Sequence, residues 1–131
     1  KTCSTREFVA EAKMLRDFLK PRGIPLIVND RLDVALAVEA DGVHLGQSDT
    51  SIEEARRVLG EHAIIGATAH SLAEALEADR SSADYLGFGH IFPTASKEKT
   101  TPPVGIDGLA EVCAAVSLPS REKICTNGLP L

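Results

Sequence analysis

The sequence predicts an α/β fold with a parallel β-sheet, and three observations lead to it. Short apolar segments rich in β-branched residues alternate with segments of helical periodicity. The predicted strands begin at similar intervals, near residues 24, 42, 63 and 84. Each one is followed by a predicted helix, as in βα units. This spacing fits either a (β/α)8 barrel or a doubly wound sheet.

The first predicted element is a helix near the start of the chain. Ser4 and Glu7 have the spacing of a capping box, in which each side chain bonds the backbone N–H of the other residue. Pro21 and Gly23 are typical of a helix end. Four apolar residues between these signals recur at helical spacing, namely Phe8, Ala12, Leu15 and Leu19.

Four βα units are predicted after this helix. The segment 24–29 is short, apolar and β-branched, as buried parallel strands are. The other strands are predicted over residues 42–46, 63–68 and 84–89. The helices are predicted over residues 33–40, 52–59, 71–79 and 106–116.

Two of these helices begin with residues that favour capping. Either Thr50 or Ser51 is the expected cap of the helix over 52–59, with Glu53 or Glu54 as its partner. Ser71 opens the next helix with a glutamate three residues later.

The length of the chain predicts an incomplete barrel with about four parallel βα units. A complete (β/α)8 barrel takes about 200 residues or more, and this chain has 131. It opens on a helix, and residues 120–131 are polar where a further strand is expected. We therefore predict a single partial domain over residues 1–131, lacking strands at both ends and atypical over 120–131.

Composition excludes several classes of protein. A net charge of −5 without a basic stripe disfavours nucleic-acid binding. Apolar runs are too short for a membrane helix, and the first residues lack a signal pattern, so we expect a cytoplasmic protein without a membrane partner. Three widely spaced cysteines indicate neither a disulfide framework nor a zinc site. Cys113 is expected to pack in the core.

Polar residues follow each predicted strand directly. In parallel α/β proteins, ligands bind at the carboxyl ends of the strands, so these residues are the first candidates for a functional site. They are Asn29 and Asp30, His44 to Asp49, Thr68 to His70, and Gly89 and His90 with Thr94 to Lys97.

The first candidates are two aspartates, Asp30 and Asp49, at the ends of neighbouring strands. Two carboxylates at one edge of a sheet repel each other unless a cation lies between them. Mg²⁺ is such a cation, because it takes one or two carboxylates, keeps waters and bridges to phosphate. The alternative is that each aspartate only caps the helix that follows it. Spacing alone favours neither interpretation.

The segment after the fourth strand has features of a phosphate site. Gly87 and Gly89 let a ligand approach the backbone, or let a helix pack closely on the strand. Thr94, Ser96 and Lys97 offer two hydroxyls and an ammonium group to a phosphate. The alternative for these three residues is a solvated charged loop.

The histidines have different expected roles. His44 lies inside an apolar strand and is more often a core residue than a catalyst, although at the mouth of a barrel it could position a heteroaromatic substrate. His70 and His90 lie near strand ends and are acid/base candidates, because histidine titrates near neutrality. His62 is predicted in a turn and without a catalytic role.

Five stretches of the chain carry a family resemblance, namely Pro25–Arg31, Ala40–Asp49, Ile65–Ser71, Ala83–Lys97 and Pro102–Gly105. Through them, and over residues 1–119, the chain resembles the thiamine-phosphate synthase family, which includes thiazole tautomerases. The resemblance implies a TIM barrel. It also implies a Mg²⁺-dependent transferase of thiamine biosynthesis that joins a pyrimidine pyrophosphate to a thiazole phosphate and releases pyrophosphate.

The resemblance also implies roles for individual residues. Asp30 and Asp49 match the Mg²⁺ ligands. The residues implied to contact the pyrimidine pyrophosphate are Lys1, Asn29, Thr68 and Lys97. Those implied to contact the thiazole phosphate are Thr94, Ala95 and Ser96.

Two alternatives stay open. One is an isomerase like the thiazole tautomerases, with His90 as the acid/base group. The other is an inactive truncated remnant, since we expect weak or no activity from this chain alone. The expected partners are small phosphorylated substrates, and open sheet edges leave homo-oligomerisation as an option.

Overall fold

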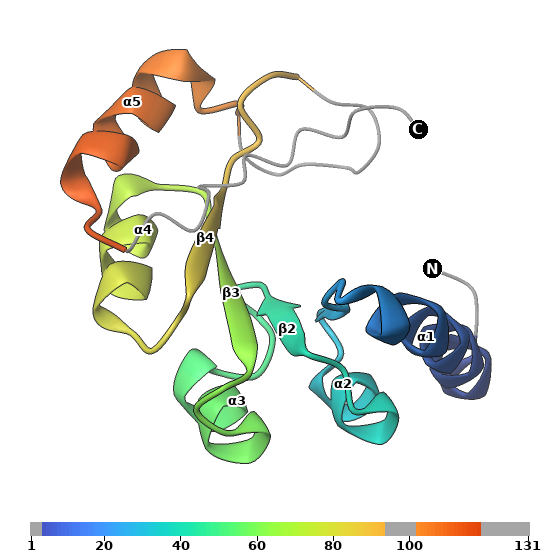
Figure 1. Ribbon diagram of the computed structural model, residues 1–131. Helices are drawn as coiled ribbons and strands as arrows, with labels where there is room; N and C mark the ends of the chain where they lie inside the picture. The colour runs from blue at the N-terminus through green and yellow to red at the C-terminus, as the bar shows by residue number, and fades with distance from the viewer. Residues whose placement is uncertain (1–3, 94–101, 119–131) are drawn as a thin grey trace. The chain divides into compact units, whose positions relative to one another are not determined.

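The computed structural model describes residues 4–93 and 102–118 (Figure 1). The chain divides into two compact units, residues 1–65 and 66–131. Within these described residues, four strands are hydrogen-bonded in the order β1-β2-β3-β4, and each is followed by a helix. Since β1 pairs parallel with β2, and β3 with β4, the predicted α/β class and its βα units are confirmed.

The first unit begins with α1, Thr5–Leu19, which has the predicted capping box. The Ser4 hydroxyl accepts from the Glu7 backbone N–H at 3.3 Å, and the Glu7 carboxylate accepts from the Ser4 backbone N–H at 2.6 Å. These bonds to Ser4 hold the pKa of the Glu7 carboxyl below its ordinary value. A short 3-10 helix, Lys20–Arg22, follows, and Gly23 ends it in the left-handed region at φ 65°.

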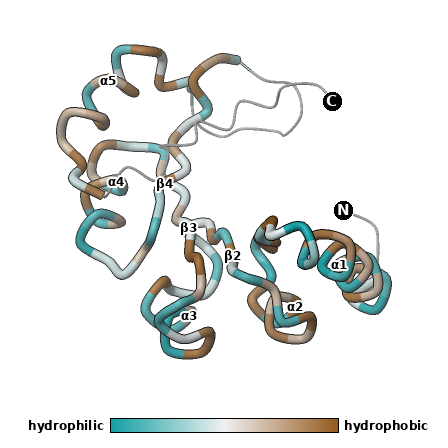
Figure 2. Tube along the Cα trace, in the orientation of Figure 1, coloured by the Kyte–Doolittle hydropathy of each residue, from teal (hydrophilic) through white to brown (hydrophobic). Residues whose placement is uncertain are grey.

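The sheet part of this unit consists of β1, Ile27–Asn29, and β2, Gly42–Leu45. The helices α2, Leu32–Val38, and α3, Ile52–Leu59, follow them, and α1 packs against α2. Each of these helices has both hydrophobic and hydrophilic residues along it (Figure 2). The buried core of the unit consists of Ala12, Val28, Val34, Ala35, Val38, Val43, Leu45, Ala55 and Ile65.

Gly42 allows an unusually close approach of backbones at the start of β2. A Cβ atom at this position would lie 1.9 Å from the carbonyl oxygen of Ile64. The Gly42 N–H donates to the Leu26 carbonyl at 3.2 Å, and the Ile64 N–H donates to the Asp41 carbonyl at 2.9 Å. Glycine is therefore required here by space.

The second unit contains most of β3, Ile64–Ala69, and all of β4, Tyr85–Phe88. Thr68 is in register with Gly87, and Ala69 with Phe88. The helix α4, Leu72–Arg80, packs against β4 and against α5, Gly105–Ala115 (Figure 1). Its N-cap is Ser71, as predicted, because the Ser71 hydroxyl accepts from the Glu74 backbone N–H at 3.2 Å.

The element boundaries differ from the predictions by up to three residues. The strand predicted from residue 24 begins at Ile27. Pro25 has no N–H, and the Leu26 N–H donates to the Asp41 carboxylate at 2.7 Å. The helix predicted to residue 40 ends at Val38, because Glu39 turns into the left-handed region at φ 51°.

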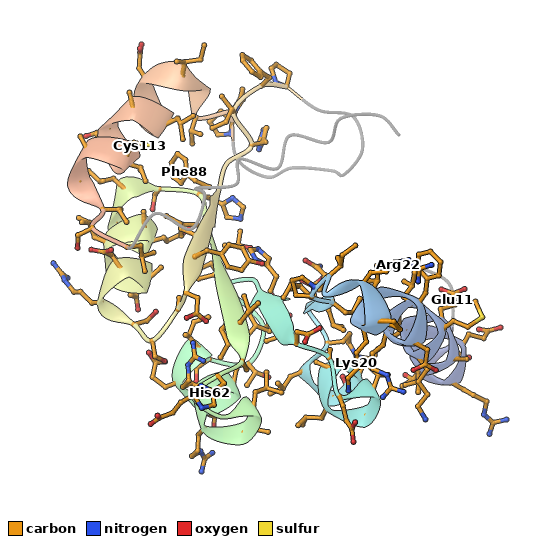
Figure 3. All side chains as sticks on the ribbon, in the orientation of Figure 1. Glu11, Lys20, Arg22, His62, Phe88 and Cys113 are labelled. Carbon is orange, nitrogen blue, oxygen red and sulfur yellow. The ribbon has the colours of Figure 1, made fainter. Side chains whose placement is uncertain are left out.

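The prediction that Cys113 packs in the core is wrong, because Cys113 is exposed. The core-facing side of α5 is set by Val112 and Val116, which lie one helical turn apart and are both buried. The residue after Val112 points in another direction. Figure 3 labels Cys113 on this helix.

Candidate functional site

The candidate site in the first unit begins with two facing residues, Asn29 and His44, at the ends of β1 and β2. They are in register, as are Val28 and Val43 one position earlier. Both valines are buried in the core, and side chains alternate along a strand. Asn29 and His44 therefore share the opposite face of the sheet, where Asn29 is exposed and His44 half-buried.

Asp30 follows β1 directly in a left-handed conformation, at φ 65°. Its backbone N–H donates to the carbonyl of His44 at 2.8 Å, so the turn after β1 is tied to β2. The next residue, Arg31, donates through two guanidinium nitrogens to the Asp33 carboxylate at 2.8 and 2.6 Å and to the Thr5 hydroxyl at 3.1 Å. The turn that contains Asp30 is thus fixed on both sides.

Asp49 folds back over the end of β2. Its carboxylate oxygen Oδ2 accepts from the Gly46 N–H at 2.7 Å, and its own N–H donates to the Gly46 carbonyl at 3.2 Å. A Cβ atom on Gly46 would come within 3.1 Å of the same carboxylate oxygen, which explains the glycine. A carboxylate has about four lone-pair sites, so one such bond leaves acceptor capacity for a cation.

The structure decides against helix capping as the role of the two aspartates. The N-cap of α2 is Arg31, and Asp30 precedes it. The N-cap of α3 is Ser51, whose hydroxyl accepts from the Glu54 backbone N–H at 3.2 Å. The capping interpretation is therefore wrong for both Asp30 and Asp49.

The charges of Asp30 and Asp49 both act on the imidazole of His44. Burial lowers the pKa of His44 below its ordinary value of 6.5, while the charges of Asp30 and Asp49 both act to raise it. Since burial is the largest cause, His44 is neutral at neutral pH. Both carboxylates act on one imidazole, which supplies no positive charge to neutralise them.

A metal site made only of protein groups is not present in the part of the chain that the structure describes. No group of three or more His, Cys, Asp or Glu side chains is placed to hold a metal ion there. A site with two carboxylates remains suited to Mg²⁺, which keeps waters and shares the phosphates of its substrate.

The strand ends of the second unit contribute Thr68, His70 and His90. Thr68 is half-buried, and His90 is only 7% exposed. The His70 ring lies 2.8 Å from the Gly89 carbonyl oxygen through Nδ1, a contact that the sequence did not predict. The glycine at the end of a strand was the available signal, but its partner could not be read from the sequence.

The remaining candidate residues lie outside residues 4–93 and 102–118. Their roles stay predictions. They are Lys1, Thr94, Ala95, Ser96 and Lys97.

The arrangement defines a class of protein, a parallel α/β fold with carboxylates at the carboxyl ends of adjacent strands. The chain belongs to the thiamine monophosphate synthase family, whose model matches residues 1–121. The resemblance stated from the sequence is thereby confirmed.

Named relatives and a solved structure agree with this assignment. A thiamine-phosphate synthase of Chloroflexus aurantiacus is 52% identical over 119 residues, which are 91% of this chain and 55% of that protein. One from Clostridium novyi is 44% identical over 120 residues, 92% of this chain and 59% of that protein. The structure of a thiamine phosphate pyrophosphorylase from Pyrococcus furiosus matches with a TM-score of 0.77 and 43% identity, over 91% of this chain and 56% of that one.

Three further findings follow from the comparisons and the structure. The structural match confirms the predicted fold, an incomplete TIM barrel with four parallel βα units in the described residues. The chain spans slightly more than half the length of these relatives. Among the described residues, no helix has the length and apolar character needed to cross a membrane.

Proposed function

We propose that this chain provides the metal-binding strand ends of a thiamine-phosphate synthase, a transferase of thiamine biosynthesis. The substrates are 4-amino-2-methyl-5-hydroxymethylpyrimidine pyrophosphate and 4-methyl-5-hydroxyethylthiazole phosphate, or the carboxylated form of the thiazole. The observation that carries the proposal is the pair of Asp30 and Asp49, which follow the adjacent strands β1 and β2 and cap no helix.

The reaction is a dissociative substitution. The bond between the pyrimidine methylene carbon and the pyrophosphate oxygen breaks, and its electron pair leaves with pyrophosphate. The thiazole nitrogen then donates its lone pair to the resulting cation and forms the new carbon–nitrogen bond. No proton is transferred in these steps, so the site needs stabilisation of the leaving group more than a general base.

Asp30 and Asp49 would hold Mg²⁺, and the two carboxylates with a neutral His44 fit this ion by charge and by donor type. When bound, Mg²⁺ neutralises charge on the pyrophosphate leaving group. Asp30 enters the site from a turn bonded to β2, and Asp49 from the turn that follows β2. These backbone bonds support a site formed at the carboxyl ends of the two adjacent strands.

Other residues are proposed to contact the substrates. Asn29 is exposed on the face that it shares with His44, which supports contact with the pyrimidine pyrophosphate. Thr68 is half-buried at the end of β3 and keeps a hydroxyl for the same substrate. Lys1 and Lys97 belong to this group by resemblance, as Thr94 to Ser96 do for the thiazole phosphate.

The cytoplasmic location, the lack of nucleic-acid and membrane partners and assembly as a homo-oligomer stay predictions. So does a single domain over residues 1–131. The small phosphorylated substrates are the partners that the family assignment supports.

The test uses this chain alone and a chimera, in which this chain replaces the matching segment of the Chloroflexus aurantiacus relative. Both are assayed for thiamine phosphate with the two phosphorylated substrates, with Mg²⁺ and with EDTA. We expect Mg²⁺-dependent turnover from the chimera and weak or none from the chain alone.

The unmodified relative controls for the assay, and circular dichroism confirms that the chimera is folded. A folded chimera without synthase activity would overturn the proposal. Turnover of a thiazole tautomer without any need for Mg²⁺ would favour the isomerase instead, since isomerisation has no pyrophosphate to neutralise.

A further inference from the structure

The side chain of His70, directly after β3, reaches the end of the neighbouring strand β4. Its ring nitrogen Nδ1 lies 2.8 Å from the carbonyl oxygen of Gly89. A carbonyl oxygen only accepts hydrogen bonds, so Nδ1 carries the proton and donates it. In the neutral ring Nε2 is then without a proton, and the bond selects one tautomer.

His70 is itself held in place by α4. Its backbone N–H donates to the Glu74 carboxylate at 2.7 Å. The Glu74 backbone N–H in turn donates to the Ser71 hydroxyl at 3.2 Å, the cap of this helix. His70 therefore lies directly before the cap of α4 and is bonded to the first turn of this helix.

Both backbone polar groups of Gly89 are hydrogen-bonded. Its N–H donates to the Ala69 carbonyl at 3.1 Å, and its carbonyl accepts from His70. Its φ of 132° is a conformation that residues with a side chain rarely adopt, and a Cβ atom would lie 3.2 Å from the Ile91 nitrogen. The chain is therefore turned sharply after β4 and fastened to the end of β3.

The next two residues are bonded to the start of α5. The His90 carbonyl accepts from the Val104 N–H at 3.0 Å, and the Ile91 carbonyl accepts from the Gly105 N–H at 3.2 Å. If the Gly89 peptide changed its orientation, the carbonyls of His90 and Ile91 would move and both of these bonds would weaken. The same change of orientation would also move the buried side chain of His90, because His90 follows Gly89 directly.

We propose that His70 is a positioning residue that fixes the Gly89 peptide and, through it, the backbone from Gly89 to Ile91. The role goes beyond the acid/base function that its place at a strand end suggests. It deepens the proposed synthase function and rests on it only for the kinetic consequence. The donor at Nδ1 is the group that matters, and Nε2 is dispensable for this role.

Three variants separate the two ring nitrogens. His70→Asn places its amide nitrogen at the reach of Nδ1, His70→Gln extends it to the reach of Nε2, and His70→Ala removes both. Hydrogen exchange of the Val104 and Gly105 amides in the 131-residue chain reports how firmly their bonds to the His90 and Ile91 carbonyls are held. We expect about five- to tenfold faster exchange in the Ala and Gln variants, and rates within about twofold of the parent in the Asn variant.

His62→Ala is the matched control, because His62 is exposed in the turn between α3 and β3 (Figure 3). We expect no change in the same amides. Equal exchange in His70→Asn and His70→Ala would overturn the proposal, and so would an unchanged rate in His70→Ala. If His70→Ala fails to fold, the comparison of the Asn and Gln variants with the parent decides.

A second measurement is independent of any variant. Long-range ¹H–¹⁵N NMR of the parent identifies the tautomer of His70, and we expect a protonated Nδ1 and an unprotonated Nε2 in the neutral ring. The opposite tautomer would overturn the proposal. In the chimera, His70→Asn is expected to retain synthase kcat/KM within about threefold, while His70→Ala loses about tenfold. A chimera without turnover would refute the synthase function and leave the exchange and tautomer results to decide the role of His70.

Discussion

Replacement of Gly42 by alanine tests how closely the backbones approach at the start of β2. The new Cβ atom would lie 1.9 Å from the Ile64 carbonyl oxygen. A Cβ atom essentially never lies within 3.0 Å of a non-bonded heavy atom, so the two backbones must separate by more than about an ångström. Such a shift strains the hydrogen bonds from Gly42 to Leu26 and from Ile64 to Asp41, at 3.2 and 2.9 Å.

The cost can be worked out from these contacts. Each backbone hydrogen bond contributes about 1 kcal/mol, and overpacking in a filled core costs about 1–3 kcal/mol. The next residue, Val43, is completely buried, so the strand cannot move without disturbing the core. We expect Gly42→Ala to lower the free energy of unfolding by about 3 kcal/mol or more.

Urea unfolding followed by circular dichroism measures this change. With an m-value of about 1–3 kcal/mol/M, the midpoint should fall by about 1–3 M. Gly108→Ala in α5 is the matched control, because its Cβ would make an ordinary 3.4 Å contact with Val104. Alanine favours a helix, so this variant should be stabilised by up to about 1 kcal/mol. A loss below about 1 kcal/mol in Gly42→Ala would refute the close approach.

Three further predictions concern a cap, the metal site and a titration. Ser71→Ala removes the cap of α4 and should cost about 1 kcal/mol in thermal unfolding, whereas a change below about 0.3 kcal/mol would contradict the cap. Asp30→Asn and Asp49→Asn should keep stability but weaken Mg²⁺ binding at least about tenfold by calorimetry, since asparagine tolerates the left-handed region and can still accept from a backbone N–H. Burial lowers the pKa of His44 in the folded chain, so below about pH 6.5 the unfolded chain binds more protons than the folded chain. The free energy of unfolding should therefore be highest above about pH 6.5 and decrease as pH falls through the folded pKa of His44. In EDTA, Asp49→Asn should lower the pKa of His44 further, as measured by NMR, because the charge of Asp49 acts to raise it. An unchanged or higher pKa would show that the Asp49 carboxylate does not act on His44.

Local signals predicted most of the secondary structure. The capping residues Ser4, Ser51 and Ser71 lie within three residues of their partners, so short sequence windows contain the whole interaction. The start of β1 was placed three residues early because it depends on a distant residue. The Asp41 carboxylate takes the Leu26 N–H, fifteen positions away.

The direction of a side chain on a helix was harder to predict than the helix itself. The segment of α5 is apolar on several sides, so periodicity does not select the buried face. Only the packing of Val112 and Val116 shows that Cys113 is turned away from the core.

The candidate site was predictable in its location and ambiguous in its chemistry. Parallel strands bring their carboxyl ends to one edge, so the order of polar residues was enough to select Asn29, Asp30 and Asp49. Aspartate is also a favoured N-cap, and the two roles differ by a shift of one or two residues in a helix start. The cap geometry of Arg31 and Ser51 was needed to separate them.

Both aspartates depend on the end of β2 for their positions, which joins the stability of this strand to the proposed metal binding. Asp30 is bonded through its N–H to the His44 carbonyl, and Asp49 is bonded at two points to Gly46. A displacement of β2 at Gly42 therefore changes the separation of the two carboxylates, although Gly42 lies at the other end of the strand. We expect Gly42→Ala to weaken Mg²⁺ binding at least about threefold under conditions in which the variant is folded, while Gly108→Ala leaves it unchanged. Calorimetric titration of the two variants measures this, and equal affinities would show that the two aspartates hold their geometry without β2.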